Sequence, residues 1–455
     1  MSNTLDSRRW SSNYLFLIAS IGSTVGLSNI WKFTYMVGAN GGGAFVLIYL
    51  ISLICLGIPV LIAELTLGRR GQRSMVGSLR NLSKHDNIGP YWQYFGWVAM
   101  FAVFLVLSFY CVIAGMTIDY TFVSITGKLT NATAESSIGY YNEILANPGR
   151  LIIYQAIFVL ATTWIVAHGV KGGLERSVRW MMPALFIILI LLVIHSMIFG
   201  EFIAAFNYMF AADFSKISGT VALNAFGQAF FSLGVGVGVM LTYGAYMPKS
   251  SSIPRSAVII GFADGLTAIV AGLAIFPIVF QYGLSPAEGP GLIFMTLPVA
   301  FGQMAGGAVI GALFFLLLVF AALSSSISLL ESIISRLEEL YSEARKKITF
   351  VSGGLLWLIG LGTVFSFNIW SDFKPLSVFT PFEEKTVFGL IDYLASNIIM
   401  PIGGILMALI AGWFLSSDIL KSELKFSKNW TFQVWRILVR FVAPAVVLLI
   451  FISNL

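Results

Sequence analysis

The sequence predicts an all-α polytopic membrane protein, and three observations lead to that fold class. Hydrophobic residues make up 58% of the 455 residues, charged residues only 11%, and the mean hydropathy of +0.88 exceeds that of ordinary globular domains. Apolar runs long enough to cross a bilayer recur along the whole chain. The basic residues gather in connections that would lie on one side of a membrane.

About eleven stretches have the length and composition of membrane-spanning helices. They lie near residues 14–37, 43–68, 92–122, 151–168, 176–199, 220–247, 256–282, 306–340, 348–366, 387–414 and 431–453. The first follows Arg8 and Arg9, but it is too long for the core of a signal peptide and lacks a small-residue cleavage site. We therefore expect it to remain in the protein as the first spanning helix.

The charges between these stretches predict the topology. With the N-terminus in the cytoplasm, the basic clusters at 69–84, 249–255, 345–347 and 421–428 are all cytoplasmic, as the positive-inside rule requires. An odd number of spans then places the C-terminus outside. Because topology explains the net charge of +6, we expect the lipid bilayer as a partner and no nucleic acid.

Residues 22–33, GSTVGLSNIWKF, interrupt the first span with polar residues and glycines. A helix in a bilayer can break only where its freed backbone groups face protein, water or a ligand. Close helix packing through Gly22 and Gly26 is an alternative explanation. A second interruption, SLGVGVG at 232–238, occurs five spans later and favours two broken helices.

Two broken spans, each the first in a group of five, indicate an inverted-repeat transporter. No linker or low-complexity tract divides the chain. We expect one membrane domain over 1–455, with repeats at about 10–200 and 220–414, an extra helix at about 431–453, and longer outer loops near 123–150 and 367–386.

The two interruptions offer groups for a zwitterion and a cation. N–H groups at the N-termini of half-helices favour an anion, and unwound carbonyl groups favour a cation. Hard cations such as sodium prefer oxygen ligands. Oxygen-bearing side chains occur in and near these segments at Ser23, Thr24, Ser28, Asn29, Ser232 and the triplet 324–326.

Four ionisable residues fall at membrane depth, where charge is costly and commonly functional. Asp264 is the most central, whereas Lys32 and Asp392 lie toward the outside, where they could pair. Glu64 lies toward the inside and could either act in transport or brace a broken helix. The sequence contains no nucleophile elbow, Walker motif or H-E-x-x-H, so we expect a transporter driven by ion gradients and not an enzyme.

The chain also resembles the neurotransmitter:sodium symporter family over nearly its whole length. The motifs that carry the resemblance are Trp10, GSTVGLSNIWKF, NGGGAF at 40–45, GIPVLIAELTLGRRG at 57–71, the spacing of Gly173 and Pro183, GQAFFSLGVGVG at 227–238, and SSSIS in span 8. The resemblance implies the leucine-transporter fold, with a 5+5 inverted repeat and broken helices 1 and 6. Among bacterial members, the chain is most similar to those that carry several hydrophobic amino acids and end after eleven spans, which implies a bacterial inner membrane.

The resemblance implies two bound sodium ions. The first would be held by the carbonyl of Thr24, the side chains of Asn29, Ser232 and Asp264, and the substrate carboxylate. The second would be held by the carbonyls of Gly22, Val25 and Ala321 and the hydroxyls of Ser324 and Ser325.

The resemblance also implies an L-amino-acid substrate. Its carboxylate would be held by the N–H groups of Leu27 and Ser28 and the hydroxyl of Tyr110, and its ammonium by the carbonyls of Thr24, Phe231 and Ser232. Its side chain would lie among Val106, Tyr110, Phe231, Gly234, Val237, Ser325 and Leu329. A leucine-selective relative has larger residues at positions 234 and 237, so we expect this chain to accept aromatic as well as branched amino acids.

Two gates and a flexible point follow from the same resemblance. The outer gate would be Lys32 and Asp392, with Phe231 as a lid. The inner gate would be Arg8 or Arg9, together with Trp10 and Glu339. Gly173 and Pro183 would mark where span 5 unwinds. Lysine at position 32 replaces the usual arginine, which removes bidentate geometry and should weaken the closed pair.

Chloride-dependent relatives have a serine four residues after the span 7 asparagine. Here these positions are Asp264 and Ala268, so a fixed carboxylate could replace the anion and we expect no chloride dependence. Coupling to protons through Asp264 or Glu64 is an alternative, and an ion channel is a further one.

Overall fold

The computed structural model describes residues 9–86, 88–287, 291–341 and 344–453, and every regular element in these ranges is helical. Within them, nine helices are long and apolar enough to cross a membrane, which confirms the predicted class. They are α4–α5 (Gly43–Gly71), α7 (Trp92–Ile125), α9 (Pro148–Ala167), α10 with its preceding π turn (Val170–Phe199), α14 (Ile253–Gln281), α16 (Gly307–Leu340), α17 (Arg345–Ser366), α18–α19 (Val387–Phe414) and α21–α22 (Asn429–Ser453).

The first predicted span is broken, as the sequence indicates. It consists of α2 (Asn13–Thr24), a π turn (Ser28–Lys32) and α3 (Phe33–Ala39), and the two halves are bent by 51°. Close packing accompanies the break, because a Cβ on Gly26 would lie only 2.6 Å from Ser325 Oγ of α16. The glycines and polar residues of this segment therefore serve both a helix break and close helix packing.

The sixth predicted span is divided into α12 (Gly219–Ser232) and α13 (Val239–Ala245). Three glycines in the intervening residues, Gly234, Gly236 and Gly238, have φ values of 59°, 96° and 74°. Glycine adopts this left-handed region without the steric cost that a Cβ brings. The eleven predicted stretches thus correspond to the nine long helices, the bent pair and α12–α13.

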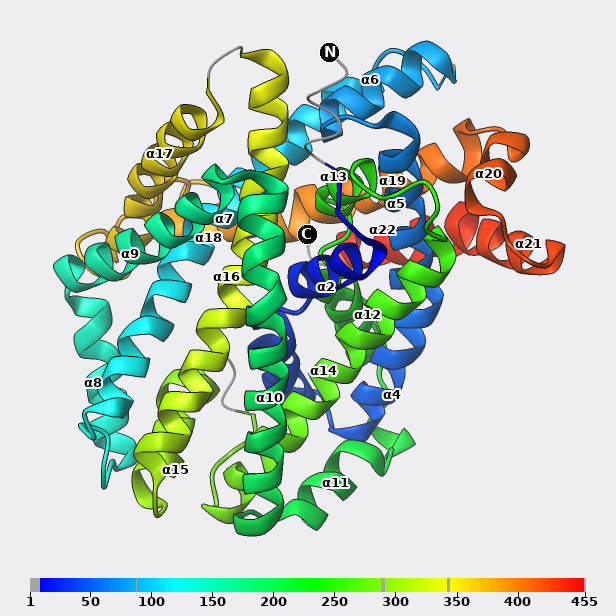
Figure 1. Cartoon of the computed structure of the whole chain (residues 1–455). Helices are drawn as coiled ribbons and strands as arrows, with labels where there is room; N and C mark the ends of the chain where they lie inside the picture. The colour runs from blue at the N-terminus through cyan, green and yellow to red at the C-terminus, as the bar shows by residue number, and fades with distance from the viewer. Residues whose placement is uncertain (1–8, 87, 288–290, 342–343, 454–455) are drawn as a thin grey trace.

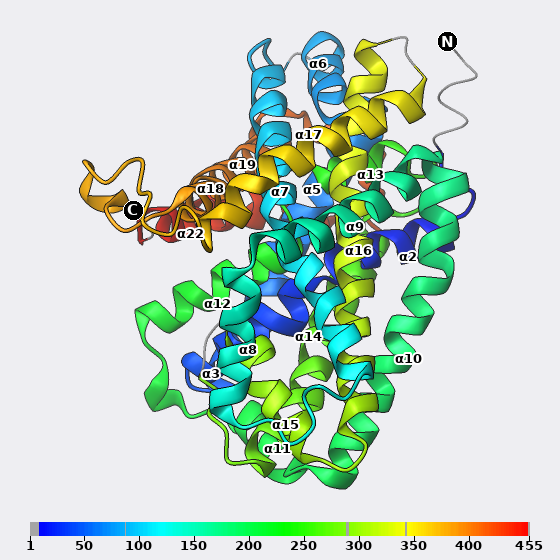
Figure 2. The same ribbon diagram turned by 90° about the vertical axis from the view of Figure 1, so that its left-hand side faces the viewer.

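Shorter helices lie at the two ends of the molecule (Figures 1 and 2). On the predicted cytoplasmic side are α6 (Met75–His85) and α20 (Ser417–Leu424); on the other are α8 (Ala134–Ala146), α11 (Phe202–Phe210) and α15 (Leu297–Gln303). The sequence prediction missed α15, which packs on α16 and α8. Its apolar run is too short to satisfy the criterion for a span.

The break in the first span lies at the centre of the helix packing. The segment from α2 to its π turn contacts α10, α12, α14 and α16, and α16 in turn packs along α7. Backbone groups that the break releases therefore face other helices and not lipid, which is the condition for an interruption at membrane depth.

Candidate substrate and ion sites

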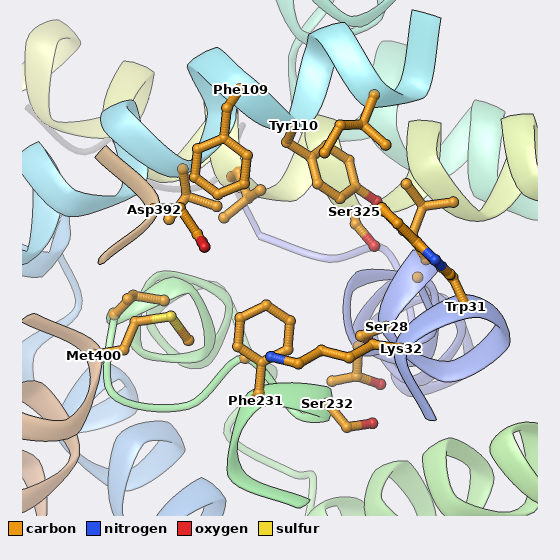
Figure 3. A pocket seen from close by; sticks show the side chains of 18 of the residues that line it. Ser28, Trp31, Lys32, Phe109, Tyr110, Phe231, Ser232, Ser325, Asp392 and Met400 are labelled. Atoms are coloured by element: carbon orange, nitrogen blue, oxygen red, sulfur yellow. The ribbon is translucent and has the colours of Figure 1, made fainter. Parts of the chain in front are cut away.

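A cavity of about 420 Å³ lies between the two broken helices (Figure 3). Every residue that the resemblance assigns to the substrate lines it: Thr24, Leu27, Ser28, Val106, Tyr110, Phe231, Ser232, Gly234, Val237, Ser325 and Leu329. The lining also includes Trp31, Phe109 and Met400, which the sequence did not single out. Trp31 belongs to the GSTVGLSNIWKF motif, which was given no role for this side chain, whereas Phe109 and Met400 are apolar residues in apolar spans that no sequence signal distinguishes from residues facing lipid.

The cavity contains a polar side chain without a partner. The hydroxyl of Tyr110 is buried and has no hydrogen-bond partner among the described residues. Nearby, Ser325 Oγ lies 3.2 Å from the carbonyl oxygen of Ser23, at the break in the first span. An unsatisfied buried hydroxyl costs about 1–3 kcal/mol, so a polar ligand group at this end of the cavity would be stabilising.

Asp264 is the centre of a buried polar cluster. Its Oδ1 accepts a hydrogen bond from Asn29 Nδ2 at 2.8 Å, and its Oδ2 accepts one from Ser232 Oγ at 2.6 Å. Asn29 Nδ2 also lies 2.9 Å from Ser232 Oγ, so the three predicted side chains of the first ion site meet. Tyr49, which the sequence analysis missed, donates to Asp264 Oδ2 at 3.4 Å.

The Asp264 carboxylate has no cationic side-chain partner among the described residues. Its side chain is fully buried, and its hydrogen-bond donors are the neutral groups of Asn29, Ser232 and Tyr49. A buried charge is stable only when another charge or several hydrogen bonds compensate it. These hydrogen bonds compensate the carboxylate but do not neutralise its charge, so a small cation that prefers oxygen ligands would complete the cluster.

Residues of the second predicted ion site lie on two neighbouring helices, α2 and α16. Ser324 Oγ and Ser325 Oγ lie 3.0 and 3.2 Å from the carbonyl oxygen of Ala321. Gly22 faces this part of α16, because a Cβ at Gly22 would lie 3.3 Å from Ser324 Cβ. Val25, the fifth predicted residue, is the C-cap of α2, where the helical carbonyl bonding ends.

Lys32 and Asp392 line the same cavity but form no ion pair among the described residues. The ammonium of Lys32 lies 3.7 Å from the centroid of the Phe231 ring, and Asp392 Oδ1 accepts a hydrogen bond from Ser396 Oγ at 2.8 Å. Figure 3 shows the Phe231 ring beside Lys32, with Asp392 across the cavity.

At the opposite end, Trp10 is buried beneath the broken helices. Its backbone N–H donates to the Tyr246 carbonyl at 3.3 Å, and its ring lies 5.1 Å from that of Tyr243. Glu339 accepts hydrogen bonds from the N–H and hydroxyl of Ser74, at 2.7 and 2.6 Å, and pairs with Arg336 at 3.2 Å. Arg8 lies outside the described residues.

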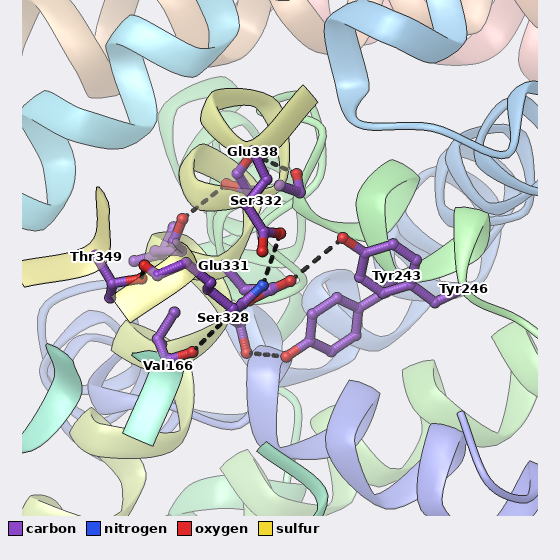
Figure 4. Close-up of polar contacts among 11 residues, drawn as sticks. Val166, Tyr243, Tyr246, Ser328, Glu331, Ser332, Glu338 and Thr349 are labelled. Atoms are coloured by element: carbon purple, nitrogen blue, oxygen red, sulfur yellow. Dashed lines mark hydrogen bonds and ion pairs between the residues drawn. The ribbon is translucent and has the colours of Figure 1, made fainter. Parts of the chain in front are cut away.

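Tyr243 and Tyr246, which contact Trp10, also belong to a polar network that extends to α16 (Figure 4). The Tyr243 and Ser328 hydroxyls lie 2.7 Å apart, and the Tyr246 hydroxyl donates to Glu331 at 3.2 Å. Arg345 pairs with Glu331, and its Nη1 lies 2.9 Å from Glu338. The sequence placed Arg345 only among the cytoplasmic charges, because its neighbours Lys346 and Lys347 suggest an ordinary basic loop.

Glu64 braces the second break. Its Oε1 accepts a hydrogen bond from the backbone N–H of Gly236 at 2.5 Å. Because Gly236 belongs to the unwound segment, this bond satisfies one of the donors that the missing helical turn releases. Glu64 was expected either to act in transport or to brace a broken helix, and its bond to the Gly236 N–H supports the bracing role.

Gly173 and Pro183 lie on one irregular helix. Gly173 is within the π turn Val170–Glu175, and a Cβ there would come 1.9 Å from the carbonyl oxygen of Ile165. Pro183 is inside α10 (Arg176–Phe199), where it removes a backbone donor. The start of α10 therefore has a weakened hydrogen-bond ladder and close contact with α9.

Comparisons with known proteins identify relatives along nearly the whole chain. The chain is 36% identical to the sodium-dependent transporter YhdH of Bacillus subtilis, over 98% of this chain and 97% of the relative. It is 35% identical to a sodium-dependent transporter of Haemophilus influenzae, over 100% of this chain and 99% of the relative. Its structure is similar to the crystal structure of MhsT in complex with L-phenylalanine, with a TM-score of 0.89 and 39% identity over 98% of this chain and 100% of that one.

The family comparison covers both halves of the chain. Residues 7–143 and 137–455 match the Sodium:neurotransmitter symporter family. The match includes both broken helices and the Asp264 cluster. Together with the similar structure, it indicates the leucine-transporter fold and a transporter, not an enzyme. The chain belongs to the sodium:neurotransmitter symporter family.

Proposed function

We propose that this chain is a sodium-coupled symporter that imports hydrophobic L-amino acids, both aromatic and branched aliphatic, by alternating access and without chloride. The observation that carries the proposal is the cavity between the two breaks, which combines the unpartnered Tyr110 hydroxyl with a mainly apolar lining. An amino acid has the same division between a charged end and an apolar side chain. MhsT, whose structure is similar, was crystallised with L-phenylalanine.

The substrate carboxylate would bind at the break in the first span. Leu27 and Ser28 offer backbone N–H groups there, and Tyr110 offers its hydroxyl. Carbonyl groups of Thr24, Phe231 and Ser232 would accept hydrogen bonds from the substrate ammonium. The side chain would extend among the apolar residues, where Gly234 leaves open space.

Two sodium ions would accompany each amino acid. Asp264, Asn29, Ser232 and Thr24 would hold the first ion beside the substrate carboxylate. The end of α2, at Gly22 and Val25, would hold the second together with Ala321, Ser324 and Ser325 of α16. With two charges, each 100 mV of membrane potential contributes about 4.6 kcal/mol, which supports roughly thousand-fold accumulation.

Alternating access would use the two ends of this cavity in turn. Lys32, Asp392 and Phe231 would close the outer end, and Trp10 with Glu339 would close the cytoplasmic end. Repeats at about 10–200 and 220–414 would move relative to one another in the cytoplasmic membrane of a bacterium. Unwinding between Gly173 and Pro183 would admit water to the second sodium ion from the cytoplasm.

Binding of tritiated phenylalanine and valine to the purified protein tests the proposal, with sodium titrated against potassium at constant ionic strength. We expect sodium-dependent binding of both amino acids with a Hill coefficient above one. Asn29→Ala and Ser324→Ala should each shift the sodium titration to higher concentrations. Binding that is indifferent to sodium would remove the symport mechanism; if it depended on pH instead, it would favour proton coupling through Asp264.

A further inference from the structure

A second cavity, of about 510 Å³, lies at the predicted cytoplasmic end of the molecule and shares no lining residue with the cavity between the broken helices. It is bounded by the end of α5 (Ile58–Gly71), the connection between α13 and α14, and α20. Both α5 and α14 contact α20. The cavity thus joins three elements that are distant in the sequence, and the transport proposal gives it no role.

The charge of this cavity is predominantly positive. Its lining includes the cationic side chains of Arg69, Arg70, Lys249 and Lys425, and a single carboxylate, that of Glu423. A positively charged cavity attracts an anion more strongly than a flat surface with the same charges, because the walls of the cavity exclude water. The composition of the lining therefore favours an anionic ligand.

The two arginines form the frame of the cavity. Arg69 is buried; its Nη1 donates to the Ser251 carbonyl at 2.7 Å, and its Nε pairs with Glu423 at 3.0 Å. Arg70 forms a bidentate pair with Asp86, at 3.1 and 2.7 Å. Both guanidinium groups are already paired with protein carboxylates, so we assign the arginines to the cavity walls and to its background charge.

The two lysines have no such partners. No carboxylate of the described residues lies within 4.0 Å of the ammonium of Lys249 or Lys425, whereas Glu423 is paired with Arg69 at 3.0 Å. Both lysines are solvent-exposed at the cavity lining. Their ammonium groups therefore remain available to a ligand.

Ser251 supplies an independent indication of a ligand. Its side chain is only 8% exposed, it lines the cavity, and its hydroxyl has no hydrogen-bond partner among the described residues. It also lies directly before Ser252, the N-cap of α14 (Ile253–Gln281), where the helix dipole favours negative charge. A buried donor is rarely left unsatisfied unless water or a ligand completes it.

We propose that this cavity binds a phosphate group, with Lys249, Lys425 and Ser251 as its donors. A tetrahedral phosphate offers several acceptor oxygens to ammonium and hydroxyl groups that converge from different elements. The position fits the phosphate of an anionic lipid in the cytoplasmic leaflet: Trp430, on the following helix α21 (Asn429–Ile437), is 62% exposed, as expected for an aromatic residue at the headgroup level. Free inorganic phosphate has the same chemistry and is the other source.

The experiment measures lipid and phosphate binding to the full-length protein. Native mass spectrometry would count phosphatidylglycerol molecules retained in the presence of a matched amount of phosphatidylcholine, and calorimetry would measure inorganic phosphate. We compare the wild type with Lys249→Gln/Lys425→Gln and with Ser251→Ala. The control is Lys84→Gln/Lys428→Gln, which removes the same charge from exposed cytoplasmic lysines that do not line the cavity.

We expect preferential retention of phosphatidylglycerol, weakened roughly tenfold or more in the Lys249/Lys425 variant and several-fold in Ser251→Ala, with the control unchanged. Binding of inorganic phosphate alone, with the same dependence on these residues, would support the site and identify the free anion as its source. Equal losses in the cavity and control variants, or retention that does not distinguish the two lipids, would overturn the proposal. Sodium-dependent phenylalanine binding, measured on each variant, confirms that it is folded.

Discussion

The ammonium of Lys32 lies 3.7 Å from the centroid of the Phe231 ring, and the two residues meet over the substrate cavity. The sequence suggested an ion pair between Lys32 and Asp392, yet both line the cavity without forming one among the described residues. A cation over an aromatic face contributes about 0.5–1 kcal/mol at exposed sites. The contact gives the proposed lid a partner on the first broken helix.

The first prediction concerns this contact. Lys32→Gln should raise the Kd for phenylalanine about two- to five-fold, which corresponds to about 0.5–1 kcal/mol. The same change in a Phe231→Leu background should have little further effect, because the aromatic face is already absent. Equilibrium binding of tritiated phenylalanine to the four proteins of this cycle measures the coupling, with Lys32→Arg as the charge-preserving control. Strictly additive losses would show that the contact does not matter.

The second prediction concerns the buried charge of Asp264. Sodium titrations of wild-type uptake should be the same in chloride and in gluconate, because the carboxylate is fixed in the site. Asp264→Asn should raise the half-saturating sodium concentration roughly tenfold or more, because a buried cation loses its compensating charge. Adding Ala268→Ser to that variant should make chloride stimulate uptake. A wild-type protein that loses most of its activity in gluconate would refute this reasoning.

The third prediction concerns substrate size. Gly234 lines the cavity, and no heavy atom lies within 4 Å of a Cβ built on it, so Gly234→Leu should fill space that a large substrate needs. Tryptophan binding should fall by roughly tenfold or more, and valine binding much less. Gly234 has a φ of 59°, which strains any larger residue, so Gly283→Leu, at a φ of 62° in open space outside the cavity, is the matched control. Equal losses for both amino acids would contradict the size argument.

The fourth prediction concerns Pro183 in α10. Proline in a helix interior costs about 3 kcal/mol or more, so Pro183→Ala should stabilise the helix against unwinding. In proteoliposomes, the rate at which the protein releases sodium-22 on its cytoplasmic side should fall several-fold. The equilibrium Kd for phenylalanine should change little. An unchanged rate of release would separate Pro183 from the opening step.

The sequence predicted the backbone breaks well because their residues contrast with their surroundings. Glycines and polar residues such as Asn29 and Ser232 stand out in apolar spans, and the structure brings these two side chains to within 2.9 Å of each other. Asp264 stood out for the same reason. The placement of all predicted substrate residues around one cavity came from the family resemblance and not from the pattern alone.

Residues that the sequence missed are those whose role depends only on tertiary position. Tyr49 is one aromatic residue in an apolar span, and only the fold brings its hydroxyl to Asp264. Arg345 precedes two lysines and so matches an ordinary basic loop in the sequence, whereas the structure pairs it with Glu331. The helix α15 was missed because its seven residues give too weak a periodic pattern.

The N-terminal segment has a further structural link, at Ser11. Both the N–H and the hydroxyl of Ser11 donate to the buried carboxylate of Glu175, at 2.6 and 2.8 Å, in the turn that precedes α10. If Ser11 moved away from this end of the molecule during transport, both oxygens of that carboxylate would lose these donors and would have to be rehydrated. Under the proposed mechanism, release of Ser11 and hydration of the start of α10 would therefore be one coupled event, because water reaches the Glu175 carboxylate only after Ser11 has left it.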